Sequence, residues 1–144
     1  MALIFQDPNS AGPFTTFQIK DVVTKVFKLT NTNFGTVAVN TLIGRLPAQA
    51  SIVRITTWVK TQLAGGGITA ATINLGLTSG GTDFVSGVSA FGTAGAYTVL
   101  SPVSGIFQPY QIPVTGDISL WLGGTATTGN PTSGEIYVMV EYVC

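Results

Sequence analysis

Histidine is absent from this chain of 144 residues, and cysteine occurs once, at the last position, Cys144. Without imidazole, a zinc site would have to be built from carboxylates and a single thiol, and a catalytic triad with a histidine base is excluded. A lone cysteine forms no disulfide within its chain, so the sequence does not indicate an oxidising compartment. We therefore predict no metal and no cofactor, and we expect Cys144 to be a solvated terminal residue.

Charged residues are scarce as well. They make up 8% of the chain, about a third of the usual roughly 25%. The six basic and six acidic residues cancel to a net charge of zero, which leaves no electrostatic footprint for nucleic acid. A chain so poor in charge, with a mean hydropathy of +0.46, is expected to be poorly soluble as a free monomer. We therefore expect its surface to be covered by other protein.

Long apolar runs are the third absence. No stretch approaches the roughly 18 apolar residues that a membrane span requires. The N-terminus has no basic region and its first apolar run stops at Gln6, which is not the pattern of a secretory signal. The sequence thus predicts synthesis in a cytosol and no membrane partner.

The first twenty residues differ from the rest of the chain. Turn-forming residues occupy 7–13, where proline fixes φ and glycine frees it. Apolar side chains flank this stretch on both sides: Leu3, Ile4, Phe5, Phe14 and Phe17. Two interpretations fit, an extended arm that lies along a partner or an N-terminal strand followed by a loop. We divide the chain into an N-terminal arm, 1–20, and a domain, 21–144.

The domain alternates between short β-type segments and loops of small residues. We expect strands at 22–29, 36–46, 51–61, 71–78, 97–100, 105–110, 117–122 and 135–143, with loops at 63–67, 84–96 and 123–134. No segment of twelve residues keeps helical spacing. About eight strands without alternating helices predict an all-β antiparallel β-sandwich, a jelly roll first and an immunoglobulin-like sandwich second.

The segment 51–61 is the strongest of these strands. Its alternation puts Val53, Ile55, Thr57 and Val59 on the apolar face, and Ile52, Arg54, Thr56 and Trp58 on the other face. Such a pattern is typical of a half-buried antiparallel strand.

Two sets of residues are candidates for chemistry or binding. Asp83 and Asp117 lie at loop–strand junctions and would be the pair for glycoside hydrolysis, but acidic residues at such places ordinarily bind local backbone amides. Trp58 and Trp121, with Tyr97 and Tyr110, would be the stacking platform of a carbohydrate-binding module, although strand aromatics more often pack across strands. We predict that the protein is not an enzyme.

Three stretches resemble small structural proteins of tailed bacteriophages. They are the Leu-Pro-Ala that opens a strand at 46–60, the strand of 71–76 followed by Gly-Thr-Asp-Phe-Val at 81–85, and the terminal strand of 134–142, which ends in Val-Glu-Tyr. The similarity runs from Leu46 to Tyr142 and leaves Met1–Lys20 outside it.

This resemblance implies a virion component, most simply a head decoration (cement) protein. Such proteins are commonly jelly-roll-like, often homotrimeric, and bind the major capsid protein on the outer surface of the head. The arm residues Leu3, Ile4, Phe5, Phe14 and Phe17 would then contact the capsid. A tail, baseplate or fibre-head module that binds a host receptor, and a carbohydrate-binding module, are the alternatives.

Overall fold

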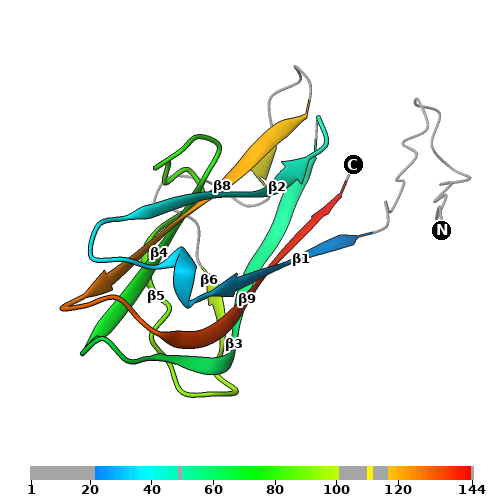
Figure 1. The fold of residues 1–144 in the computed structure, drawn as a ribbon. Coiled ribbons are helices and arrows are strands. Elements are labelled where there is room, and N and C mark those ends of the chain that lie inside the picture. Colours follow the sequence, from blue (N-terminus) through cyan, green and yellow to red (C-terminus); the bar gives the residue numbers. More distant parts are fainter. Residues whose placement is uncertain (1–21, 49, 101–109, 112–116, 144) are drawn as a thin grey trace, which may run out of the picture.

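The computed structural model describes residues 22–48, 50–100, 110–111 and 117–143, and these residues form two packed β-sheets (Figure 1). The arm, residues 105–109, the side chain of Tyr110 and Cys144 lie outside this description. The strands are β1 (Val23–Thr30), β2 (Val39–Leu46), β3 (Ser51–Ala64), β4 (Ala70–Gly76), β5 (Val85–Ser89), β6 (Tyr97–Leu100), β7 (Tyr110–Gln111), β8 (Ile118–Thr127) and β9 (Ser133–Val143), with a 3-10 turn at Asn31–Asn33.

The strand order is that of a jelly roll. Sheet A has the order β1-β9-β3-β6, with β7 also paired to β3, and sheet B has the order β2-β8-β4-β5. Every pairing between named strands is antiparallel. Successive strands mostly alternate between the two sheets, so each sheet is built from segments distant in sequence. The jelly-roll prediction is confirmed, and the immunoglobulin-like alternative is wrong.

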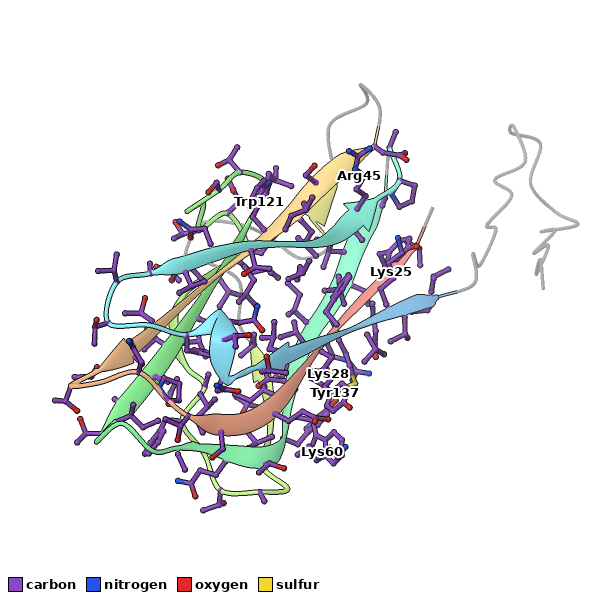
Figure 2. All side chains as sticks on the ribbon, viewed as in Figure 1. Lys25, Lys28, Arg45, Lys60, Trp121 and Tyr137 are labelled. Carbon is purple, nitrogen blue, oxygen red and sulfur yellow. The ribbon has the colours of Figure 1, made fainter. Side chains whose placement is uncertain are left out.

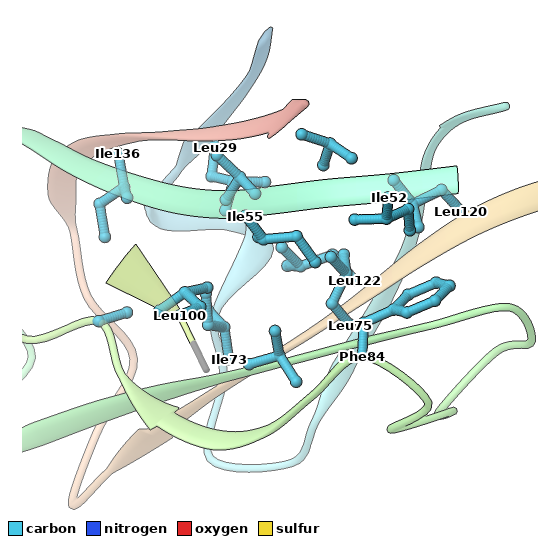
Figure 3. Close-up of a cluster of buried hydrophobic side chains, with 14 of the residues drawn as sticks. Leu29, Ile52, Ile55, Ile73, Leu75, Phe84, Leu100, Leu120, Leu122 and Ile136 are labelled. Atoms are coloured by element: carbon cyan, nitrogen blue, oxygen red, sulfur yellow. The ribbon is translucent and has the colours of Figure 1, made fainter. Parts of the chain in front are cut away.

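The core lies between the sheets and is filled by aliphatic side chains from both (Figure 3). Alternation supplies it: in β9 the buried residues are Ile136, Val138 and Val140, and in β8 they are Leu120 and Leu122. Phe84, just before β5, is the largest fully buried side chain. Because a strand turns alternate residues to opposite sides, these positions fix which residues lie on the outer faces.

The predicted faces at the start of β3 are wrong. A register shift between Ile52 and Arg54 opposite β9 marks a β-bulge, and an extra residue there inverts the alternation. Ile52 is therefore fully buried, whereas Val53 is 41% exposed. From Ile55 to Val59 the residues lie on the predicted faces, although Thr56 on the outer face is only 1% exposed, and a second register shift follows Val59.

Three segments predicted as loops contain strands. Residues 85–89 form β5 and pair with β4, and Leu63 belongs to β3 and is buried in the core. β8 continues through Gly123 and Gly124 to Thr127. Glycine is required at position 124 because a Cβ there would lie 2.0 Å from the backbone oxygen of Asn33.

The seam between β1 and β2, the edge strands on one side of the sandwich, is closed by side chains. Lys25 Nζ donates to the carbonyl oxygen of Arg45 and lies 5.8 Å from the ring centroid of Tyr142. Beside it Phe27 packs on Gly44, where an added Cβ would come within 2.5 Å of the ring. The long edge of β1 thus has a charged and an aromatic side chain directed across the seam.

Candidate interaction surface

The outer face of sheet A has apolar side chains in register across four strands. Val26 of β1 pairs with Met139 of β9, and Met139 is linked through Thr56 of β3 to Val99 of β6. In the next row, two residues further along β3, Trp58 lies between its partners Tyr137 of β9 and Tyr97 of β6. We call the following six residues the apolar stripe: Val26, Tyr97, Val99, Trp58, Tyr137 and Met139.

Four side chains of the apolar stripe are exposed, and the other two, Tyr137 and Met139, are partly buried. Val26, Tyr97 and Val99 are each more than half exposed, and Trp58 is 38% exposed. The Trp58 and Tyr137 rings are stacked, with centroids 5.5 Å apart and planes at 25°. Thr56, at the base between Met139 and Val99, is only 1% exposed. Contiguous apolar surface of this kind is typical of a contact site, whereas single exposed apolar residues are not.

One end of the apolar stripe is bounded by an ion pair. Arg54 Nε and a terminal guanidinium nitrogen donate to the two carboxylate oxygens of Glu141, at 2.9 and 2.7 Å. This two-point hydrogen bonding and the negative charge raise the pKa of Arg54. A bidentate pair holds both side chains in one orientation, so it forms a fixed polar border.

The other end is bounded by a cluster around Glu135. Lys60 and Lys28 lie 3.0 Å from its two carboxylate oxygens, and the Tyr137 hydroxyl donates to it as well. The hydrogen bond from Tyr137, followed by those from Lys60 and Lys28, lowers the pKa of the Glu135 carboxyl from 4.5 to about 2. Figure 2 shows Lys28, Tyr137 and Lys60 together on this side of the molecule.

The outer face of sheet B has a different chemistry. Its cross-strand rows are Asn40–Gly123–Asn74 and Leu42–Trp121–Gly76, and a third row contributes threonines from β8 and β4. Trp121 lies between the buried Leu120 and Leu122, so it faces outward from sheet B. Hydroxyl and amide groups dominate here, where aromatic and ionic groups dominate on sheet A.

The two tryptophans therefore lie on opposite outer faces of the sandwich. Trp58 belongs to sheet A and Trp121 to sheet B, and Figure 2 shows Trp121 far from Tyr137, the residue on which Trp58 stacks. The structure does not bring Trp58 and Trp121 together in one platform. It brings Trp58 beside Tyr97, as the aromatic interpretation expected, and adds Tyr137, which that interpretation had missed.

The two candidate catalytic carboxylates lie in different places: Asp83 is bound within a turn, and Asp117 is exposed at the start of a strand. Asp83 Oδ2 accepts a hydrogen bond of 2.8 Å from the backbone N–H of Leu77 and thereby holds the turn between β4 and β5. Asp117 lies exposed just before β8. In the part of the chain that the structure describes, no three acidic, cysteine or histidine residues are grouped as metal ligands, and no helix there is long and apolar enough to cross a membrane.

Comparison with solved structures identifies the same fold in phage capsids. A chain of the capsid asymmetric unit of cyanophage Pam1 matches with a TM-score of 0.58 and 18% identity, over 96% of both chains. A chain of the capsid of Ralstonia phage GP4 matches with a TM-score of 0.55 and 20% identity, over 98% of this chain and 90% of that one. No protein-family model and no curated protein matches the sequence. At this identity the likeness establishes the fold, and in both cases it extends over almost the whole of each chain.

Proposed function

We propose that this protein is a structural component of a bacteriophage virion, and that it is a decoration protein on the outer surface of the head. The observation that carries the proposal is the full-length likeness to chains of two phage capsids, at 96% and 90% of those chains. Each of these capsid chains thus consists almost entirely of one such domain.

The chemistry of the surface supports a binding role. The apolar stripe offers contact area with fixed ionic borders. A rigid β-sandwich with an apolar outer face can bind the assembled shell. If it binds the assembled state and not the dissociated subunits, it stabilises the assembled state by mass action. Low charge makes such attachment less sensitive to salt, because screening acts on exposed charges.

The proposal includes the arm. Its apolar residues, Leu3, Ile4, Phe5, Phe14 and Phe17, contact the major capsid protein or a neighbouring copy, and the protein is a homotrimer. Repeated weak contacts around a symmetry axis then add up to firm attachment.

Immunogold electron microscopy of the phage that encodes this chain tests the proposal. Antibodies against the recombinant protein are expected to label the heads of intact particles evenly, and antibodies pre-adsorbed with the protein are the control. Labelling restricted to the tail would overturn the decoration role in favour of a tail or receptor-binding module. Purified particles without the chain would overturn the virion role itself.

A further inference from the structure

The apolar stripe is too small to hold a second rigid copy firmly. Six partly exposed side chains of these types present on the order of 400 Å² of apolar surface, whereas a stable interface buries roughly 800 Å² on each partner. The apolar stripe measures roughly 15 Å across its four strands, which lie about 4.8 Å apart, and its two charged ends bound it along the strand direction. These dimensions suit a short extended segment with two large side chains.

The chain itself contains such a segment. Phe14 and Phe17 are separated by two threonines, and the four residues carry no charge. In an extended polyproline-II segment, which has three residues per turn, both phenyl rings fall on one face and their Cα atoms lie about 9 Å apart, within the roughly 15 Å that the apolar stripe measures across the strands. The uncharged segment also suits a surface whose charges are paired at its two ends.

The position of this segment along the chain favours a neighbouring copy over its own domain. β1 begins at Val23, at the edge of sheet A. Residues 18–22 include no glycine or proline and contain two β-branched residues, so the sequence offers no tight turn that would reverse the chain onto its own sheet. Chain lengths of five and eight residues span at most about 17 and 27 Å, so this part of the chain is long enough to reach beyond the edge of its own sheet.

We propose that the segment Phe14–Phe17 of one copy docks across the apolar stripe of a second copy. The two phenyl rings pack against Trp58 and Val99, and the arm adds to the interface the area that the stripe alone does not supply. This deepens the proposed function, on which it rests for a homo-oligomer, and assigns sheet A to contacts between copies. The outer face of sheet B and the far end of the arm, Leu3–Phe5, are then left free to contact the capsid shell.

Disulfide trapping between two variants tests the proposal. In the full-length chain with Cys144→Ser, one protein carries Phe17→Cys and the other Val99→Cys. We expect the mixture, under mild oxidation, to yield a covalent species of two different chains. The matched control replaces the second protein by Val37→Cys, because Val37 is 80% exposed in the loop before β2 and lies outside the apolar stripe. The control is expected to cross-link at least tenfold more slowly.

Two results would overturn the proposal. One is a mixture that cross-links no faster than the control. The other is a single chain with both cysteines, Phe17→Cys and Val99→Cys, that closes an internal disulfide instead of joining two chains.

Light scattering supplies an independent measurement. Phe14→Ser with Phe17→Ser is expected to raise the concentration for half-dissociation at least a hundredfold, and an oligomer that persists unchanged in this variant would refute arm docking. None of these measurements depends on the virion, so failure here is distinguishable from failure of gold labelling.

Discussion

Paired substitutions of Leu122 and Leu42 test the register of sheet B most directly. Leu122 is fully buried in the core, whereas Leu42, on the neighbouring strand, is 46% exposed on the outer face. Leu42 pairs with Trp121, the residue next to Leu122. A shift of either strand by one residue would move that strand's leucine to the opposite face, because successive residues face opposite sides.

The magnitude follows from burial. Leu122→Ala removes three carbons from a closed core, which costs about 2.5 kcal/mol in transfer free energy, and the cavity that remains raises the loss to about 3–5 kcal/mol. Leu42→Ala removes the same atoms from a half-exposed site, so we expect a loss of about 1 kcal/mol.

Urea denaturation followed by tryptophan fluorescence measures both losses, at one fixed protein concentration because the protein is expected to be oligomeric. The slope of the free energy of unfolding against urea is expected to stay constant, since neither substitution changes the surface that unfolding exposes. A difference of less than 1 kcal/mol between the two variants would refute the assignment of faces in sheet B.

Three further predictions concern a glycine, an acid and an ion pair. Gly124→Ala is expected to lower the thermal midpoint severely, because its Cβ would meet the Asn33 backbone oxygen at 2.0 Å; a midpoint within a degree of the parent would contradict this. The folded pKa of Glu135, about 2, lies below the unfolded value of 4.5, so its stabilising contribution is complete above pH 4.5 and is lost as the pH falls toward 2. Titration of the unfolding free energy should show a shallower acid decline in Glu135→Gln than in the parent, and identical profiles would refute the role of this carboxyl. Arg54→Gln, at the exposed Glu141 pair, is expected to leave the urea midpoint almost unchanged in 0.5 M salt, a result that a large shift would exclude.

Alternation along single strands was sufficient to predict most of the sandwich. In β9, Ile136, Val138 and Val140 are buried as the pattern required. The bulge at Ile52 could not be predicted because an extra residue is defined only by the strand opposite. The role of Gly124 also depends on a distant segment. Its glycine-rich surroundings are typical of a loop in sequence, but in the fold the absence of a side chain lets the Asn33 backbone lie close to β8.

The apolar stripe is a property of four strands in register, which no single segment reveals. Trp58 and Tyr97 were recognisable as aromatic residues on predicted strands, but Tyr137 and Val99 join them only through the pairings of β3 with β9 and β6. Trp121 looked equivalent to Trp58 in sequence and faces the opposite way, since its strand belongs to the other sheet. Sheet membership is decided by the connections of the jelly roll, and the pattern within a strand does not encode it.

The closed seam between β1 and β2 has a consequence for crowding. Proteins held at high density present their strand edges to one another, and an open edge invites the addition of further strands and growth into fibres. Here Lys25 binds the Arg45 carbonyl across that edge, and a strand added there would have to strip the ammonium group of its partner. A chain this poor in charge has little mutual repulsion to keep copies apart, so the occupied Arg45 carbonyl is a local obstacle to strand addition at this edge of the sandwich.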